Sequence, residues 1–203
     1  MMDLYGHDIS GNTYKAKLLM SILGVEYNYI QLDVMNKAHK KVDYLKLNPR
    51  GEFPVLVDGD EVIWDSQAIL IYLARQYQPG NSQYDWYPDN AAEMAQISQW
   101  LMVANNEIFH SLAKARVIVK LGFEGDLAAC QEKGQQLLQW LNEHLEDNDW
   151  LANNKLSIAD ISCYPYVALC EEGGLDLKPY ENIQQWFKRI AAIKNYVTMP
   201  GLF

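Results

Sequence analysis

Hydrophobic and polar positions follow different patterns in the two halves of the chain. In the first half, short apolar runs alternate with amphipathic segments, and Asp58-Gly59 is a strong hairpin signal. Strands are predicted at 2–5, 25–33, 55–57 and 61–64, and helices at 13–23, 36–47 and 66–77. After residue 88 only the helical period remains, and helices are predicted at 88–121, 126–145, 157–173 and 182–193.

This change of pattern predicts two domains. A strand–helix–strand crossover implies a parallel strand pair, and the hairpin adds antiparallel strands. The resulting order β-α-β-α-β-β-α over residues 1–77 is thioredoxin-like. The segment 78–88 is rich in proline, glycine and small polar residues and is the predicted linker, and 89–203 is the predicted all-helical domain. The apolar tail at 199–203 either covers a pocket or only packs on its domain.

The segment 48–57 combines a helix stop with the start of a strand. Pro49 and Gly51 break the preceding helix. Pro54 stands where the strand begins, one of the few places where a strand tolerates proline. Because a residue before proline is restricted to extended conformations, Phe53 is expected to be extended, with its backbone groups outside the strand ladder.

A second feature follows the hairpin, where Asp65-Ser66 opens a helix. Both residue types are good N-caps, so an ordinary cap is one interpretation. A helix N-terminus also attracts anions. In the second interpretation, Ser66 holds a carboxylate and Asp65 holds a cationic amine.

A strand-edge proline, a tight hairpin and an Asp-Ser helix start, in this order, resemble the glutathione site of the glutathione S-transferase family. The resemblance implies a cis Phe53–Pro54 bond, with the backbone of Phe53 pairing with the cysteinyl part of glutathione. It also implies that Asp65 and Ser66 bind the γ-glutamyl amine and carboxylate. The family more often has Glu before this Ser and Val before this Pro, so we expect a shifted glutamyl contact.

The first predicted helix opens with residues 10–15, Ser-Gly-Asn-Thr-Tyr-Lys. Redox-active thioredoxin-like folds carry Cys-x-x-Cys there, and this chain does not. The segment is similar to the Ser-Gly-Asn-x-x-Lys opening of many bacterial transferases of the family, which implies that the catalytic group is Ser10. Ser10 can also be an ordinary cap, and Tyr5, Asn12 and Tyr14 are alternative partners for a thiolate.

One hydroxyl together with a helix N-terminus is energetically sufficient for such a role. Lowering a thiol pKa from about 8.5 by about two units takes about 2.7 kcal/mol. A charge-assisted hydrogen bond supplies roughly 1.5–3 kcal/mol. A nearby helix N-terminus adds a few tenths to about 1 kcal/mol more.

The resemblance also implies contacts outside these motifs. Some family members use the second-helix region against the glycyl carboxylate of glutathione, which points to His39 or Lys40. The second half of the long helix faces the electrophile pocket in the family. The residues expected at that pocket are Asn12, Tyr14, His110 and Arg116. For the helical residues, an ordinary polar helix face is the alternative.

The second half carries a structural motif as well. Ser157 and Asp160 have the spacing of a capping box, with Asp in place of the usual Glu or Gln. This motif resembles the box that starts the buried helix of the family's C-terminal domain. Cys163 and Cys170 are seven residues apart and are expected on one buried face of that helix.

Composition limits the classes of partner. The net charge of −9 argues against broad binding of nucleic acid or anionic membranes. No stretch approaches the roughly 20 apolar residues of a membrane span, and no signal-peptide pattern is present. Three cysteines without paired spacing favour a reduced cytoplasm, and the scattered histidines suggest no metal site.

An anionic ligand on an acidic chain needs local cations. Five lie in the first 50 residues, and most are expected to be solvated: Lys15, Lys17, Lys40, Lys41 and Arg50. One or two of them are expected to contact a ligand.

The leading hypothesis is a cytoplasmic glutathione transferase that conjugates the glutathione thiolate to hydrophobic electrophiles in detoxification. Glutathione is then a co-substrate, no metal is needed, and the family resemblance implies a homodimer. One alternative is a glutathione-dependent peroxidase that uses the same site. The other is a non-catalytic protein of this fold that binds ligands or partners.

Overall fold

The computed structural model describes residues 2–78 and 84–202. It separates into two compact units. The sheet unit comprises Met1–Asn81 and Asn195–Pro200, and the helical unit comprises Ser82–Lys194 and Gly201–Phe203. Part of the predicted linker at 78–88, residues 79–83, lies outside the described residues, as does Phe203 of the tail.

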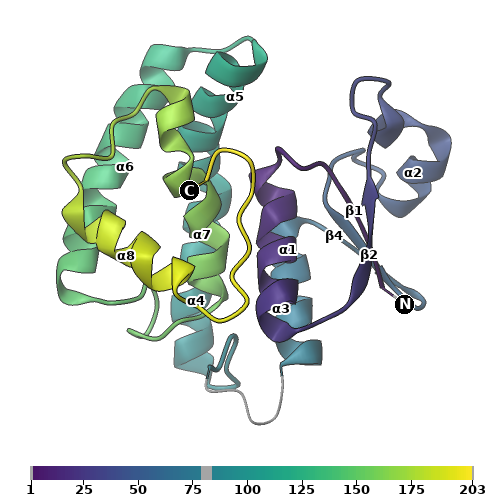
Figure 1. The fold of residues 1–203 in the computed structure, drawn as a ribbon, viewed down its shortest axis with the longest axis horizontal. Helices are drawn as coiled ribbons and strands as arrows, with labels where there is room; N and C mark the ends of the chain where they lie inside the picture. Colours follow the sequence, from purple (N-terminus) through teal and green to yellow (C-terminus); the bar gives the residue numbers. More distant parts are fainter. Residues whose placement is uncertain (1, 79–83, 203) are drawn as a thin grey trace. The chain divides into compact units, whose positions relative to one another are not determined.

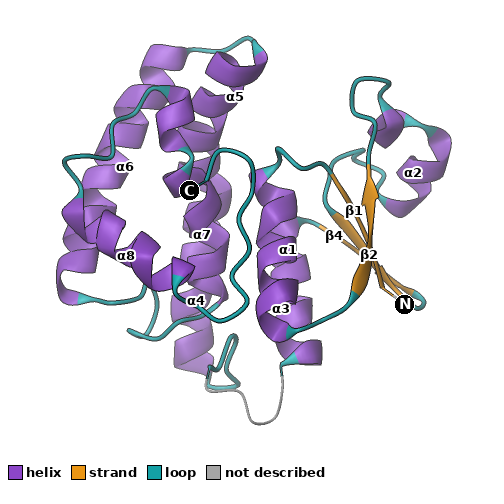
Figure 2. Ribbon diagram, in the orientation of Figure 1, coloured by secondary structure: helices purple, strands orange, loops and turns teal. Residues whose placement is uncertain are grey.

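The sheet unit contains a mixed four-stranded sheet (Figures 1 and 2). Its elements are β1 Met2–Gly6, α1 Gly11–Leu23, β2 Tyr27–Gln31, the short 3₁₀ segment η1 Ala38–Lys40, α2 Val42–Leu47, β3 Val55–Asp58, β4 Glu61–Trp64 and α3 Ser66–Tyr77. The strand order is β2-β1-β3-β4, with β1 and β2 parallel and the other pairs antiparallel. The predicted thioredoxin-like order is therefore confirmed.

Alternation along the strands divides the apolar residues between the two faces of the sheet. Leu4 pairs with Leu56, and both are fully buried. The next pair, Tyr5 and Val55, belongs to the opposite face, where Val55 packs with Tyr44 of α2. Figure 1 shows α1 and α3 on one side of the sheet and α2 on the other. Both faces of the sheet are therefore covered, and Tyr5 lies on the face that packs against α2.

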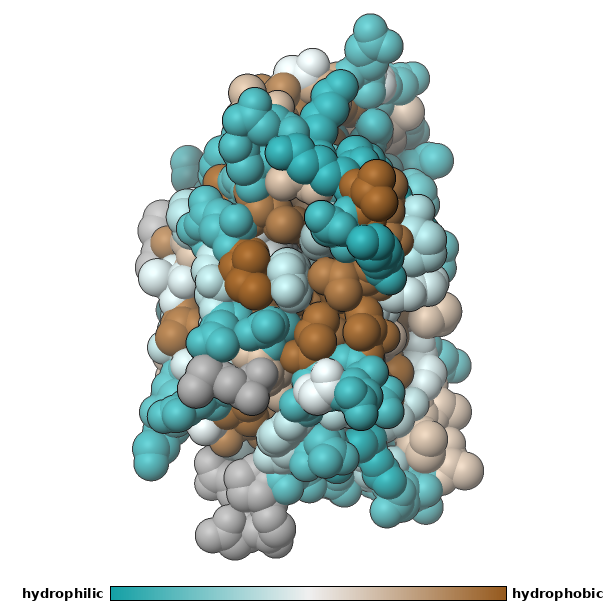
Figure 3. Space-filling model, turned by 90° about the vertical axis from the view of Figure 1, so that its right-hand side faces the viewer, coloured by the Kyte–Doolittle hydropathy of each residue, from teal (hydrophilic) through white to brown (hydrophobic). Residues whose placement is uncertain are grey.

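Part of the sheet unit's surface is apolar. Met35, Val42 and Val62 are 91%, 72% and 42% exposed. Figure 3 looks onto the face at the right of Figure 1 and shows apolar side chains gathered among polar ones. Such exposed apolar surface favours association with another molecule.

The helical unit begins with one continuous helical run, as predicted for 88–121. The run consists of α4 Ala91–Val103, the π-helical segment η2 Ala104–Ala113 and α5 Lys114–Leu121. The remaining elements are α6 Leu127–Asp147, α7 Ile158–Ala168, the 3₁₀ segment η3 Cys170–Gly173 and α8 Glu181–Ala191. Asn90 and Asp126 cap α4 and α6 through their side chains.

The predicted capping box at the start of α7 is confirmed. The Ser157 hydroxyl accepts a hydrogen bond from Ala159 N, and an Asp160 carboxylate oxygen accepts one from Ser157 N. The other oxygen of Asp160 accepts from Leu151 N and from the indole N–H of Trp186. Asp160 therefore joins three segments of the unit. Its burial raises its pKa to about 6.

The structure differs from the sequence analysis in some details. Most of the five cations were expected to be solvated, whereas Lys15 is only 1% exposed, on the buried side of α1. The predicted helix at 36–47 is two short pieces, η1 and α2. Cys163 and Cys170 are buried, as expected for small apolar core residues, but Cys170 lies in η3 and not on the same helix as Cys163. Cys130 is buried as well, and burial raises the pKa of Cys170 to about 12.

Candidate functional site

A small cavity of about 40 Å³ opens where the loop before β3 meets the start of α3. Four of the predicted glutathione-binding residues line it together: Phe53, Pro54, Asp65 and Ser66. Asn12, from the first turn of α1, also lines it, although it was predicted for the electrophile pocket. Arg50, one of the five cations of which one or two were expected to contact a ligand, also lines the cavity. Three further lining residues were not assigned to it by the sequence analysis: Asn48, Glu52 and Trp64.

The loop that presents Phe53 is fixed by a buried amide. Asn48 is 2% exposed, and its side-chain N–H donates to the Glu52 carbonyl at 2.7 Å. The same carbonyl accepts from the Tyr44 hydroxyl at 2.8 Å. The Phe53–Pro54 bond is cis, as the resemblance implies. Within residues 2–78 and 84–202, the N–H and C=O of Phe53 form no hydrogen bond, so both are available to a ligand backbone.

Asp65 and Ser66 occupy different positions at the start of α3. Asp65 is the N-cap, and its Oδ1 accepts from Gln67 N at 2.8 Å and from Ala68 N at 3.4 Å. Ser66 is the first helical residue and only 3% exposed. Its hydroxyl has no hydrogen-bond partner in the described part of the chain, yet the residue lines the cavity. A hydroxyl that borders a cavity at a helix N-terminus is suited to an anionic group.

Ser10 is the N-cap of α1. Its oxygen accepts a hydrogen bond from Thr13 N at 3.2 Å, and its own N–H donates to the His7 carbonyl at 3.0 Å. The cap orients the hydroxyl oxygen toward the helix and uses one of its lone pairs. The hydroxyl proton is not involved in that bond, so it can be donated to an incoming group.

His39 and Lys40 lie against the Phe53 loop but do not line the cavity. The His39 ring meets the Phe53 ring edge-on, with centroids 5.7 Å apart. Lys40 Nζ donates to the Arg50 carbonyl at 3.1 Å. Gly51 allows this approach, because a Cβ there would lie 2.8 Å from the His39 carbonyl oxygen. Burial, followed by the charges of Lys40 and Lys37, lowers the pKa of His39, so its ring tends toward the neutral form.

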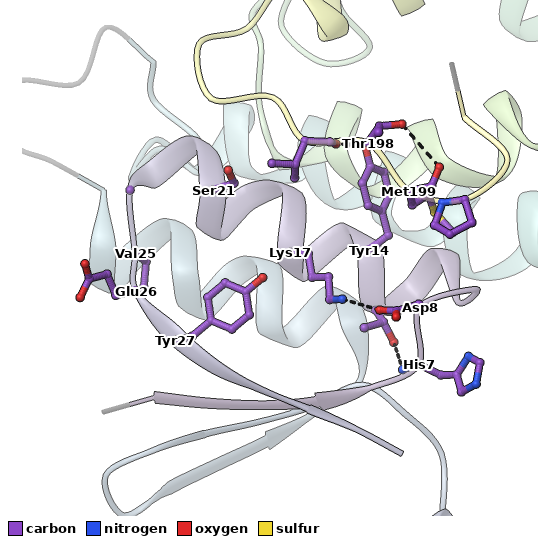
Figure 4. A pocket seen from close by; sticks show the side chains of 14 residues that line it. His7, Asp8, Tyr14, Lys17, Ser21, Val25, Glu26, Tyr27, Thr198 and Met199 are labelled. Carbon is purple, nitrogen blue, oxygen red and sulfur yellow. Dashed lines mark hydrogen bonds and ion pairs between the residues drawn. The ribbon is translucent and has the colours of Figure 1, made fainter. Parts of the chain in front are cut away.

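A larger hollow of about 490 Å³ lies between α1 and the segment 197–200, which returns to the sheet unit from the C-terminal end of the chain (Figure 4). Tyr14 and Lys17 of α1 form one wall, and Thr198–Pro200 of the returning segment form another. In Figure 4, the Tyr14 ring points toward the segment that carries Thr198 and Met199. The hollow reaches His7 in the loop that leads to Ser10. Tyr14 therefore lies in this hollow and not in the smaller cavity.

An ion pair crosses this hollow. Lys17 Nζ lies 2.7 Å from an Asp8 carboxylate oxygen and 3.2 Å from the centre of the Tyr29 ring. The hydrogen bond from Lys17 lowers the pKa of Asp8. The carboxylate is therefore ionised at neutral pH, and the pair contributes almost no net charge to the hollow.

The two predicted residues of the helical unit are not brought together. His110 is exposed and lines a groove of about 760 Å³ between the α4–η2 run and α6, beside Leu137 and Trp140. Arg116 is 3% exposed, and its Nε lies 2.5 Å from a Glu172 carboxylate oxygen. Arg116 does not line this groove. Its geometry is that of a buried structural ion pair.

Metal ligands do not cluster in the part of the chain that the structure describes, where no three His, Cys, Asp or Glu side chains converge. None of the helices formed by the described residues is long and apolar enough to cross a bilayer.

Three features together indicate one class of protein. They are a thioredoxin-like sheet unit, an all-helical second unit, and a cavity that lies at a helix N-terminus beside a cis-proline. Models of the glutathione S-transferase N-terminal and C-terminal domains match residues 1–75 and 112–194. Glutathione S-transferase D6 of Drosophila melanogaster is 32% identical over 188 residues, 92% of this chain and 86% of that protein. The chain belongs to the glutathione S-transferase family.

Solved structures agree with this assignment. The glutathione S-transferase from Pseudomonas fluorescens has a TM-score of 0.89 at 30% identity, with 98% of each chain covered. Ure2p in complex with glutathione has a TM-score of 0.83 and covers 96% of this chain and 90% of that one. At 22% identity, the second likeness shows the fold alone.

Proposed function

We propose that this family member conjugates the thiolate of glutathione to hydrophobic electrophiles, as a detoxifying transferase. One observation carries the proposal. The cavity beside Pro54 brings together the unused backbone groups of Phe53, the Ser66 hydroxyl and the Asp65 carboxylate. These groups match a peptide backbone, a carboxylate and an amine, which are the parts of a γ-glutamyl-cysteinyl peptide.

In this proposal each group of glutathione has a partner. Phe53 pairs with the cysteinyl backbone, and Ser66 with the N-terminus of α3 binds the γ-glutamyl carboxylate. Asp65 attracts the amine with the carboxylate oxygen that does not cap the helix. His39 or Lys40, beside the Phe53 ring, remains the proposed contact for the glycyl carboxylate.

Ser10 is the proposed thiolate stabiliser. Its oxygen is held by Thr13 N, so the hydroxyl proton can point to the sulfur without a change of rotamer. The thiolate then attacks the electrophile, a carbon–sulfur bond forms, and the leaving group departs with its electron pair or the adduct takes up a proton. No covalent bond to the protein is formed. Metal and redox cofactors are not part of this step.

The sheet unit supplies a surface for the electrophile. One end of the α1 hollow is lined by His7, Tyr14 and Met199, and His7 belongs to the loop that leads to Ser10. The rest of the electrophile pocket, including a contribution from His110, remains a proposal from the family resemblance. Arg116 is a weaker candidate, because it is buried in its pair with Glu172.

We also propose a homodimer in a reducing cytoplasm. Exposed aromatic side chains are available for association on both units: Trp64 is 40% exposed and Trp140 is 45% exposed. The cysteines are free and buried, which is compatible with a reducing compartment. Sedimentation velocity at micromolar concentration tests the dimer.

The test of the transferase is the thiol pKa of bound glutathione, measured by thiolate absorbance against pH. We expect a value below about 7 in the unmodified protein and a rise of at least about one unit in Ser10→Ala. Ser10→Thr is the control, because it keeps both the hydroxyl and a good N-cap. Conjugation of 1-chloro-2,4-dinitrobenzene is followed in the same samples.

Each outcome has a definite reading. A depressed pKa that is unchanged in Ser10→Ala transfers the role to another group and keeps the transferase. Normal thiol titration, or no binding of glutathione, contradicts the proposed function. Reduction of cumene hydroperoxide with no conjugation favours the peroxidase alternative.

A further inference from the structure

His7 opens the loop between β1 and α1, and this loop ends at the N-cap residue Ser10. The His7 side chain is half-buried and lines the α1 hollow. Its ring centroid lies 6.4 Å from that of Phe53, and its carbonyl accepts a hydrogen bond from Ser10 N at 3.0 Å. Phe53 and Ser10 are the residues proposed to hold the cysteinyl backbone and the thiolate. His7 therefore contacts both of them and also faces the hollow proposed for the electrophile.

The loop fixes the backbone and one ring nitrogen of His7. Its N–H donates to the Thr13 hydroxyl at 3.3 Å, as Figure 4 shows. Gly6 permits this approach, because a Cβ at Gly6 would overlap the Thr13 side chain. The ring Nδ1 accepts a hydrogen bond from Ile9 N at 3.4 Å. In a neutral imidazole the nitrogen that accepts carries no proton, so the proton of the His7 ring is on Nε2.

The Nε2–H group of His7 is available as a donor. In the described part of the chain, Nε2 has no hydrogen-bond partner. In Figure 4 the imidazole points away from the ion pair of Asp8 and Lys17. Two other polar side chains of the hollow are already engaged, since Lys17 pairs with Asp8 and the Tyr14 hydroxyl donates to the Val197 carbonyl. A fixed donor beside a reacting centre stabilises negative charge that develops there.

On the basis of the proposed transferase function, on which this role rests, we propose that His7 is a catalytic residue for α,β-unsaturated carbonyl electrophiles. The thiolate sulfur forms a bond with the β-carbon, and the electron pair of the C=C bond moves to give an enolate with its negative charge on the carbonyl oxygen. The Nε2–H of His7 donates a hydrogen bond to this oxygen. The α-carbon then takes up a proton from water, which replaces the proton that the thiol released, and the saturated adduct departs.

A displacement reaction gains less from this donor. When chloride leaves a benzylic carbon, the electron pair of the breaking bond goes to chloride and no oxyanion forms. His7 therefore affects how fast one class of electrophile reacts, whereas Ser10 is the residue proposed to ionise the thiol. A comparison of the two reaction classes isolates the role of His7, because both use the same thiolate.

The test compares kcat/KM for an enone, 4-phenyl-3-buten-2-one, with that for 4-nitrobenzyl chloride at saturating glutathione. Two variants separate the ring nitrogens. In His7→Asn the amide oxygen replaces Nδ1 as the acceptor for Ile9 N, but the donor at Nε2 is lost. In His7→Gln the amide N–H reaches the place of Nε2. We expect the enone-to-chloride ratio to fall about 10- to 100-fold in His7→Asn and to recover in His7→Gln to within about fivefold of the unmodified protein.

Asp8→Asn is the matched control. It removes the ion pair that ties the same loop to Lys17 and leaves both ring nitrogens of His7 in place. The enone-to-chloride ratio of Asp8→Asn should stay within about twofold of that of the unmodified protein, because a surface ion pair contributes little. Both rates are measured on one sample, so a smaller folded fraction in any variant cancels in the ratio.

Three results would overturn the role of His7 and leave the transferase intact. The first is an unmodified protein that conjugates the chloride and not the enone. The second is an unchanged ratio in His7→Asn. The third is an equal fall in His7→Gln or in Asp8→Asn, which would assign the effect to the loop and not to the Nε2 donor. No conjugation of either electrophile would contradict the proposed transferase and, with it, the role of His7.

Discussion

The hydroxyl of Tyr14 donates a 2.6 Å hydrogen bond to the backbone carbonyl of Val197, 183 residues further along the chain. Ser21, two turns further along α1, donates in the same way to the Asn195 carbonyl at 2.8 Å. These two bonds attach the returning segment 195–200 to the side of α1. The Tyr14 proton is thus engaged with a carbonyl, whereas the Ser10 proton is available.

We predict that Tyr14→Phe leaves the thiol pKa of bound glutathione unchanged while it weakens the attachment of the tail. Loss of one buried hydrogen bond should lower the free energy of unfolding by about 1 kcal/mol. Limited proteolysis should cut the region after residue 194 faster. Ser21→Ala is the control, since it removes the companion bond without touching Tyr14. A rise in the thiol pKa of a unit or more in Tyr14→Phe would make Tyr14 the thiolate partner.

Asp65 allows the capping and binding roles to be separated. Asparagine is as good an N-cap as aspartate and tolerates a positive φ, which is 77° at this position. Asp65→Asn should therefore keep the free energy of unfolding within about 0.5 kcal/mol. It should raise the KM for glutathione about tenfold, because the amine loses a charged partner.

Asp65→Ala completes this comparison. It should raise the KM in the same way and also lower the free energy of unfolding by about 1 kcal/mol, because the cap is lost. Chemical denaturation and steady-state kinetics measure the two effects. An unchanged KM in Asp65→Asn would leave Asp65 with the capping role alone.

The fold could be predicted because its signals are local. The short apolar runs at 2–5 and 55–57, the Asp58-Gly59 turn and the Ser157–Asp160 spacing each depend on a few neighbouring residues. Element ends were less accurate: the strand predicted at 25–33 spans Tyr27–Gln31. The first and last residues of a strand or helix depend on tertiary packing, and a sequence pattern does not show that packing.

The site could be predicted only in part. Phe53, Asp65 and Ser66 meet in one cavity as expected, because the hairpin between them returns the chain to the same place. The ion pair of Arg116 with Glu172 joins residues 56 positions apart and has no local signal. The burial of Lys15 was missed for the same reason, since a lysine on a helix gives no indication of what packs above it.

Glu172 is predicted to stabilise the helical unit through Arg116. Burial by itself would raise the pKa of Glu172, but the hydrogen bonds from Lys120 and Arg116 outweigh this effect and lower it. Glu172→Gln would remove the carboxylate that pairs with the guanidinium of Arg116, whose side chain is 4% exposed. We expect a loss of about 3–5 kcal/mol in the free energy of unfolding. Lys120→Gln, which removes the more exposed partner, should cost about 1 kcal/mol or less.

The pH dependence of this effect has a definite sign. Because the pKa of Glu172 is lowered on folding, its contribution to stability is present above the ordinary value of 4.5 and is lost as the pH falls through the folded pKa. The difference between the unmodified protein and Glu172→Gln should therefore shrink in acid. A difference that grows in acid, or a change in the KM of the electrophile at constant stability, would contradict a purely structural role for this pair.

Asp160 should show the opposite dependence. Its burial raises its pKa from the ordinary value of 3.8 to about 6. Between these two pH values the unfolded chain has lost the proton while the native protein keeps it. The unfolded state then binds fewer protons, so the free energy of unfolding falls as the pH rises through this window, by about 3 kcal/mol at most.

Asp160→Asn cannot titrate at this position and isolates the effect. The variant should be less stable at every pH. Leu151 N, Ser157 N and the indole N–H of Trp186 now donate to carboxyl oxygens, and the amide N–H group of Asn would face at least one of these donors in place of an acceptor. Its deficit relative to the unmodified protein should be largest near pH 4 and smaller at pH 7, as measured by urea unfolding. A deficit that grows towards pH 7 would show that the three donors outweigh burial and keep Asp160 ionised in the native protein.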